Sequence, residues 1–251
     1  MNNKSKLIIF LHFHKAGGTT INKMFNNHNK YPENHNGNPF HLSKIITYWN
    51  YNRRQFNYFK NHCINNNVEF ICLEWNFFKF FNELNLDNIE LITCIRDPYS
   101  RFKSNLNHNS QLFYKVKNYK LNYKDWVKET IFWKTKDNVK KFKLNYNKYN
   151  YYVKLLNGLG DNPDIEINES HLDNAKNILS KFNTILILED KSSFNLLNKY
   201  NILYDNTKKN VCHEYNTNLI IPSYEEFKKE NYYDYKLFEY AKELSENMKI
   251  K

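Results

Sequence analysis

The sequence predicts an α/β fold, a three-layer sandwich in which helices flank both faces of a central parallel sheet. Four short apolar runs, rich in β-branched residues and with little alternation, cover residues 7–11, 68–73, 89–95 and 184–188. Runs of this kind are typical of strands that are covered on both faces. Helical segments separate the runs, and strands joined through helices pair in parallel. In such a sheet, ligands bind at the carboxyl ends of the strands.

Helical periodicity is clearest in six segments, at residues 51–64, 98–107, 123–132, 146–156, 170–181 and 223–248. The last segment begins with Ser223 and has Glu226 three residues later, which predicts a capping box. Pro98 fits the first turn of the second segment, where a missing N–H loses no hydrogen bond. We expect residues 29–43 and 201–222 to form loops.

Length and charge limit the classes of protein. The chain of 251 residues is long enough for one sizeable α/β domain, and no stretch rich in Gly, Pro or Ser divides it. We therefore expect a single domain over residues 1–251. The net charge of +11 suits an anionic ligand and would also suit nucleic acid. Because the sequence has no Arg-rich tract or zinc-finger spacing, we expect no nucleic-acid partner.

The cysteines and the apolar segments bear on metal binding and location. No pair among Cys63, Cys72, Cys94 and Cys212 has the spacing of metal ligands, so we expect no metal centre. Because four cysteines are too few for a disulfide-rich scaffold, we infer a reducing compartment. The first apolar run is too short for a signal peptide or a membrane span, and no other segment has the length that a span needs. We expect a soluble, cytoplasmic protein.

The first candidate site follows the first predicted strand. His14-Lys15-Ala16-Gly17-Gly18-Thr19-Thr20 leads from that strand into a helical segment. A glycine-rich turn that opens a helix is typical of sites that bind phosphate-like anions. Glycines allow a close approach of the backbone, and Lys15 supplies a positive charge. The Lys precedes the glycines, unlike in the common nucleotide loop G-x-x-x-x-G-K-[ST], which indicates a different activated anion.

A second candidate site follows the third predicted strand, in Arg96-Asp97-Pro98-Tyr99-Ser100-Arg101-Phe102-Lys103-Ser104. Arg96 at the strand end and Ser104 on the helix could converge on a second anion, because a guanidinium fork and a hydroxyl together form a phosphate clamp. The alternative is structural, with an Arg96–Asp97 pair or an Arg101 ion pair at the surface and an ordinary proline at the helix start.

Together the two motifs resemble the sulfotransferases that use 3′-phosphoadenylyl sulfate, in particular the carbohydrate branch related to heparan sulfate 2-O- and 6-O-sulfotransferases. The first motif of that family typically reads PKTGGTT, and the second reads RDPxxRxxS, which this chain matches from Arg96 to Ser104. Weaker similarity to the family continues at residues 150–158, 171–194 and 231–241, so that the resemblance covers nearly the full chain.

The resemblance implies a topology like that of P-loop NTPases and a 3′-phosphoadenylyl sulfate co-substrate, with no metal required. It implies that Lys15 contacts the bridging and sulfuryl oxygens and that residues 17–20 hold the 5′-phosphosulfate. Ala16, where the family has Thr, would contribute only backbone donors. Arg96 and Ser104 would hold the 3′-phosphate. The sulfuryl group would pass in line to a hydroxyl of a small-molecule or glycan acceptor.

Several residues are candidates for the general base that accepts the proton of the acceptor. In the family it lies just beyond the second strand, which here ends at Glu74, so Glu74 is our first candidate. A carboxylate there could instead interact with a helix dipole. His14 is the second candidate, although it could merely pack. His12 and His41 are weaker candidates, the former more simply explained by burial and the latter by solvation.

Two other functions stay open on the sequence. A nucleotide kinase or NTPase would need a Gly-Lys-Ser/Thr order and an acidic Mg²⁺ ligand at a strand end, and the former is absent. A non-catalytic relative could bind an acidic polymer through the basic, aromatic residues 115–154. That segment has the pattern of amphipathic helices with solvated Lys faces, and a mobile lid or acceptor-binding surface is its sharper interpretation.

Overall fold

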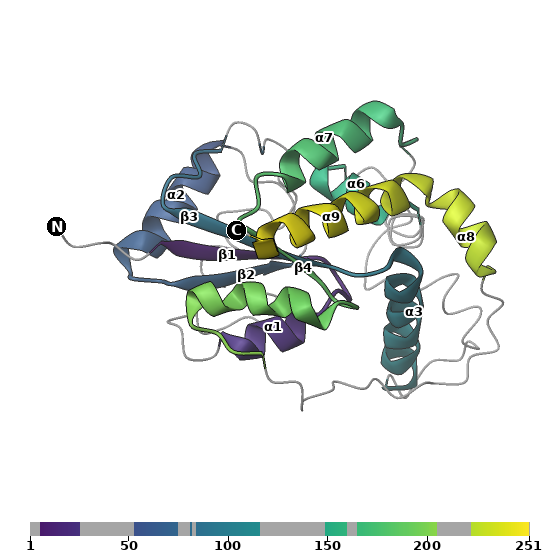
Figure 1. Cartoon of the computed structure of the whole chain (residues 1–251), viewed down its shortest axis with the longest axis horizontal. Helices are drawn as coiled ribbons and strands as arrows, with labels where there is room; N and C mark the ends of the chain where they lie inside the picture. The colour runs from purple at the N-terminus through teal and green to yellow at the C-terminus, as the bar shows by residue number, and fades with distance from the viewer. Residues whose placement is uncertain are drawn as a thin grey trace.

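A four-stranded, all-parallel sheet forms the centre of the computed structural model (Figure 1). Its strands are β1 (Leu7–His12), β2 (Phe70–Glu74), β3 (Ile89–Ile95) and β4 (Thr184–Ile187). All four strands predicted from the apolar runs are confirmed. The structure describes residues 6–25, 53–74, 81, 84–115, 149–159, 165–204 and 222–250. The predicted helix 123–132, the loop 29–43 and most of the loop 201–222 lie outside these residues.

The strand order is β2-β1-β3-β4. From β1 the chain first adds β2 on one side and then crosses over to add β3 on the other side. At the carboxyl end of β1, His12 lies opposite Glu74 of β2 and Cys94 of β3. A change in the direction of strand order leaves a crevice outside the carboxyl ends of the two strands involved. This topological switch point lies between β1 and β3.

Helices cover both faces of the sheet, as predicted. Alternate residues of β1 enter two separate core clusters, with Leu7, Ile9 and Leu11 on one face and Ile8 and Phe10 on the other. The first face packs against α2 (Arg53–Asn65), α6 (Tyr151–Leu156), α7 (Glu169–Leu179) and α9 (Tyr232–Ile250). The second packs against α1 (Gly18–Met24) and the 3₁₀ helix η2 (Lys191–Tyr200). In Figure 1, α6, α7 and α9 lie above the sheet and α1 below it.

Two further helices lie beyond the carboxyl ends of the strands. α3 (Pro98–Lys115) follows β3 directly, and Pro98 is its first residue, as predicted. α8 (Tyr224–Glu230) begins with the predicted capping box of Ser223 and Glu226. The two helices meet where Phe102 of α3 stacks on Phe227 of α8, with ring centroids 4.9 Å apart. No helix among the described residues is long and apolar enough to cross a membrane.

The helix predicted over residues 223–248 is in fact two helices, α8 and α9, separated at Asn231. The Asn231 side chain is almost fully buried; its amide donates to Phe227 O, and its Oδ1 accepts the N–H of Asn150 at 2.8 Å. A tertiary hydrogen bond therefore accounts for the break. Of the helix predicted over residues 146–156, residues 146–148 lie outside the described residues, and α6 begins at Tyr151, after Asn150 with its left-handed backbone (φ of 46°). The 3₁₀ helix η2 was not predicted.

α6 and α9 cap each other at their first turns. The Asp234 carboxylate of α9 accepts the N–H groups of Tyr152 at 3.1 Å and Val153 at 3.0 Å. In return, the Asn150 side chain accepts the N–H of Asp234 at 3.2 Å. N–H groups in the first turn of a helix have no partner within the helix, so each side chain satisfies donors of the other element. This contact fixes the direction in which α6 enters the core.

Burial raises the pKa of Asp234 to about 6, against the two N–H donors and the nearby charges of Arg101 and Lys154, which lower it. A carboxyl group with a raised pKa stabilises the folded state most below its unfolded pKa, and that contribution is lost as the pH rises through the folded pKa.

We therefore expect the free energy of unfolding of the wild type to fall, relative to that of Asp234→Asn, by roughly 3 kcal/mol between about pH 4 and pH 7. Urea denaturation of the two proteins across this range provides the measurement. Parallel pH profiles would show that Asp234 does not titrate in this way.

Candidate functional site

The loop after β1 has two residues in the left-handed region, Lys15 with φ of 64° and Gly17 with φ of 83°. Gly17 is the N-cap of α1 and has no side chain to cap the first turn, and no acidic residue lies in that turn. The N–H groups of residues 18–20 precede the first intrahelical bond and can donate to an anion. Ala16 is fully buried, and its N–H donates to Phe13 O at 3.0 Å inside the loop.

The two glycines meet different steric requirements. Gly17 needs its positive φ, and a Cβ there would also lie 2.9 Å from Leu188 Cδ1. Gly18 lies directly against the ring of His12, and a Cβ there would be 1.9 Å from Nε2. His12 is buried and stacks on Phe10 with ring centroids 5.6 Å apart. His12 therefore packs, as its simpler interpretation had it, and it makes glycine necessary at the first residue of α1.

The turn after β3 is held by two carboxylates. Asp97 Oδ1 accepts the N–H of Ser100 at 2.8 Å and so caps the start of α3. Glu189, just after β4, accepts the N–H of Asp97 at 3.1 Å, and its Oε1 lies 3.6 Å from Arg96 Nε, an ion-pair distance. Burial raises the pKa of Glu189, partly offset by the Asp97 N–H and by Arg96. Glu189 thus contacts both the backbone of Asp97 and the side chain of Arg96 in this turn.

The two sequence motifs are in direct contact. The Nη1 of Arg96 donates to the carbonyl oxygen of Lys15 at 3.4 Å, although the residues are 81 positions apart. An arginine side chain has five N–H donors, so this bond and the Glu189 ion pair do not exhaust it. The Arg96 side chain is 27% exposed, so part of it is accessible to solvent. The contact lies at the switch point between β1 and β3, where an α/β sheet of this order places its ligands.

Adjacent tyrosines of α6 reach both motifs. The Tyr151 hydroxyl accepts the N–H of His14 at 2.9 Å. The Tyr152 hydroxyl donates to Arg96 O at 2.8 Å and accepts the Arg96 N–H at 3.1 Å. The Arg101 guanidinium lies 3.9 Å from the centre of the Tyr151 ring and is almost fully buried. Arg101 is therefore not in the surface ion pair of the structural alternative, whereas Arg96 does pair with a carboxylate, that of Glu189 and not the expected Asp97.

The structure brings some predicted site residues together and leaves others apart. His14, Lys15 and Arg96 converge through the contacts above, and residues 17–20 follow immediately, with Thr19 exposed and Thr20 half-buried. Glu74 ends β2 opposite His12, which places its backbone at the predicted edge of the sheet. Ser104 is half-buried in the second turn of α3, and the contacts of the described residues do not join it to Arg96.

Three residues of the site were not nominated from the sequence: Tyr151, Tyr152 and Glu189. Each falls within a segment of weak similarity to the sulfotransferases, at 150–158 or 171–194. The similarity marks these segments as part of the resemblance, but it does not indicate that these three side chains contact the two motifs. Their contacts with Arg96, Asp97 and His14 span 56, 92 and 137 positions of sequence.

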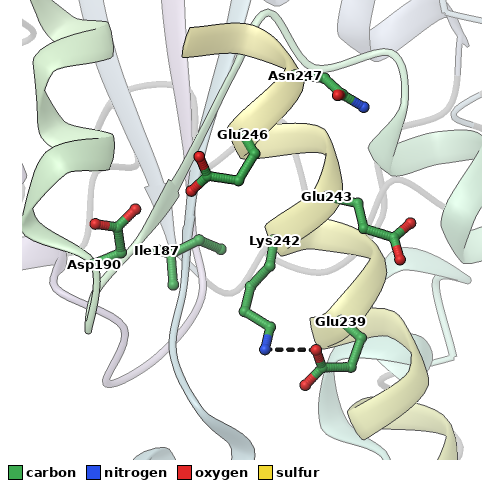
Figure 2. A pocket seen from close by; sticks show the side chains of 7 residues that line it. All are labelled: Ile187, Asp190, Glu239, Lys242, Glu243, Glu246 and Asn247. Atoms are coloured by element: carbon green, nitrogen blue, oxygen red, sulfur yellow. Dashed lines mark ion pairs between the residues drawn. The ribbon is translucent and has the colours of Figure 1, made fainter. Parts of the chain in front are cut away.

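Two pockets lie elsewhere on the molecule. One, of about 610 Å³, lies between α9 and the end of β4 and is lined by Ile187, Asp190, Glu239, Lys242, Glu243, Glu246 and Asn247 (Figure 2). Carboxylates dominate its charged groups, so it would repel an anion. The other, of about 470 Å³, lies at the amino ends of the strands beside Glu90 and Tyr200. Neither is lined by the loop after β1 or by Arg96.

The chain matches no protein-family model, and no curated protein is significantly similar to it in sequence. Among the described residues, no group of three or more His, Cys, Asp or Glu side chains could hold a metal ion. The interpretation of the site therefore depends on its geometry and on the motifs themselves.

The close contact between Gly18 and His12 makes a testable prediction. Gly18→Ala should lower the free energy of unfolding by roughly 1–3 kcal/mol, because the new methyl group overlaps the His12 ring. In a His12→Ala background the same substitution should have a clearly smaller effect. Urea denaturation of the four proteins gives the coupling energy. Thr19→Ala, an exposed change in the same turn, is the control, and fully additive effects would contradict the packing.

Proposed function

We propose that this protein is a sulfotransferase that moves a sulfuryl group from 3′-phosphoadenylyl sulfate to a hydroxyl acceptor, with a carbohydrate as the acceptor class. The proposal includes a topology like that of P-loop NTPases. The observation that carries it is the contact between Arg96 Nη1 and Lys15 O. That contact supports a single site for two anionic groups, and the two phosphate positions of this donor distinguish it from ordinary adenine nucleotides.

The donor set of the loop suits the 5′-phosphosulfate. The first turn of α1 has N–H groups without intrahelical partners and no acidic residue, and its N-cap Gly17 has no side chain. Gly17, Gly18, Thr19 and Thr20 would hold the phosphosulfate, and Lys15 would stabilise charge on the bridging oxygen. Because Ala16 is buried and its N–H is engaged by Phe13, we assign Ala16 to the conformation of the loop rather than to direct contact.

Arg96 would bind the 3′-phosphate through the N–H groups that Lys15 and Glu189 do not engage. Ser104 would add a hydroxyl donor from α3. In the reaction, an acceptor oxygen attacks sulfur as the bond from sulfur to the phosphate oxygen breaks, and 3′-phosphoadenosine 5′-phosphate leaves. The acceptor proton passes to a base, for which Glu74 is the first candidate and His14 the second. Positioning and preorganised positive charge supply the catalysis.

The proposal retains a cytoplasmic location. Cys63, Cys72 and Cys94 are buried thiols, which persist in a reducing compartment.

The first test compares nucleotides that differ in the 3′-phosphate. By isothermal titration calorimetry, the wild type should bind 3′-phosphoadenosine 5′-phosphate more tightly than AMP by roughly tenfold or more, because Arg96 adds charge-assisted hydrogen bonds. Arg96→Ala should abolish the preference. Lys181→Ala is the control and should preserve the preference. It removes an exposed positive charge just before β4, at the amino ends of the strands. Equal affinity of the wild type for AMP, or tighter binding of ATP, would reject the proposed donor.

The second test addresses the base. Glu74→Gln should leave the affinity for 3′-phosphoadenosine 5′-phosphate unchanged and lower turnover by about 10²–10⁴-fold, because the acceptor keeps its proton. Turnover is measured as release of 3′-phosphoadenosine 5′-phosphate from the sulfate donor, with desulfated heparin and simple sugars as acceptors. His14→Gln is the matched variant. Full turnover in Glu74→Gln together with loss in His14→Gln would transfer the role to His14.

A further inference from the structure

Tyr151 and Tyr152 are neighbours in sequence, yet each hydroxyl is bonded to a different half of the candidate site. Tyr151 bonds the backbone of His14 in the loop after β1, and Tyr152 bonds the backbone of Arg96 in the turn after β3. Consecutive residues of a helix point about 100° apart, so the first turn of α6 can serve two segments at once. The rings lie at 64° to one another with centroids 5.4 Å apart.

We propose that Tyr151 and Tyr152 are positioning residues, each of which holds a different half of the anion site. Tyr151 sets the position of the loop that would hold the 5′ group, and Tyr152 sets the position of Arg96 and so the selectivity for a 3′-phosphate. This inference rests on the proposed function, because it assigns the two halves to the two ends of the same donor.

The Tyr152 contacts fix the backbone from which the Arg96 side chain starts. One hydroxyl bonds both the N–H and the carbonyl oxygen of Arg96, at 3.1 and 2.8 Å. The ring itself is fully buried and packs edge-on against Phe13, with centroids 4.9 Å apart. Burial raises the pKa of the Tyr152 hydroxyl well above its ordinary value, so that it keeps the proton that it donates. A rigid ring with a protonated hydroxyl leaves Arg96 little freedom to shift.

The Tyr151 contact acts on the other half. Its hydroxyl accepts the N–H of His14, the residue before Lys15, at 2.9 Å. Arg101 covers the face of its ring at 3.9 Å and Phe13 packs edge-on at 6.3 Å, so the ring is held from two sides. Since Lys15 has a left-handed backbone, the loop depends on such external contacts to keep its shape.

The two roles predict different effects on ligand selectivity. Tyr152→Phe should weaken binding of 3′-phosphoadenosine 5′-phosphate by roughly tenfold and leave AMP binding unchanged, so that the ratio of the two affinities falls. Tyr151→Phe should weaken the binding of both nucleotides by a similar factor, so that the ratio of the two affinities is unchanged. Isothermal titration calorimetry with the two nucleotides measures both quantities.

Tyr200→Phe is the matched control. Its hydroxyl contacts Thr184 at 3.1 Å and Glu90 at 3.2 Å near the amino ends of the strands, so its loss should change neither affinity. A further comparison places Tyr152→Phe in the Arg96→Ala background. If Tyr152 acts through Arg96, the second substitution should have no additional effect on the bisphosphate. A general loss of structure would weaken both ligands in every background.

A second measurement avoids destabilisation. 3-Fluorotyrosine placed at either position keeps the hydroxyl and reports its surroundings by ¹⁹F NMR. The resonance at position 152 should shift with the bisphosphate and not with AMP, whereas that at 151 should shift with both.

The outcomes separate the two levels of the proposal. Equal wild-type affinity for the bisphosphate and AMP would overturn the proposed function. A wild type that prefers the bisphosphate, with both Phe variants losing selectivity equally or not at all, would overturn the division of roles alone.

Discussion

The buried carboxylate of Asp234 is the contact on which the candidate site depends. It satisfies two N–H groups at the start of α6, and it is almost fully shielded from water. Burying a carboxylate is costly unless it is paired and hydrogen-bonded, and here the N–H groups, Arg101 and Lys154 offset only part of that cost, so the pKa of Asp234 stays raised. Because α6 is only six residues long, it has little helical stability of its own. Its first turn, with Tyr151 and Tyr152, is therefore positioned by α9 rather than by its own sequence.

The first turn of α6 in its turn holds the two segments that follow β1 and β3. The strand order makes these segments neighbours at the switch point, and the tyrosines fix their backbones. The Arg96 contact with Lys15 then joins them directly. Glu189 pairs with the Arg96 guanidinium and partly balances its positive charge, and partial burial raises the pKa of Glu189. A site held in this way can present donors to an anion without rearrangement, which is the condition for electrostatic catalysis of group transfer.

The sequence predicts the sheet well because strands covered on both faces leave unmistakable apolar runs. It also predicts the capping box at Ser223 and the start of α3 at Pro98, since both are local signals. The sequence does not predict features that depend on contacts with residues far away in the chain. Apolar periodicity continues through Asn231, and the break there coincides with a hydrogen bond to the distant Asn150. Likewise, the need for glycine at position 18 arises from the His12 ring, and Arg101 is buried because Tyr151 covers it. Neither packing contact is visible in a local motif.

We propose that the loop after β1 and Arg96 form one site for a donor with two phosphate positions. A crystal structure of the protein with 3′-phosphoadenosine 5′-phosphate tests it most directly. We expect the 5′-phosphate within hydrogen-bond distance of the N–H groups of residues 18–20, and the 3′-phosphate on the Arg96 guanidinium. A nucleotide bound away from Arg96, for example with only its 5′-phosphate on the loop or in the pocket beside α9, would contradict it.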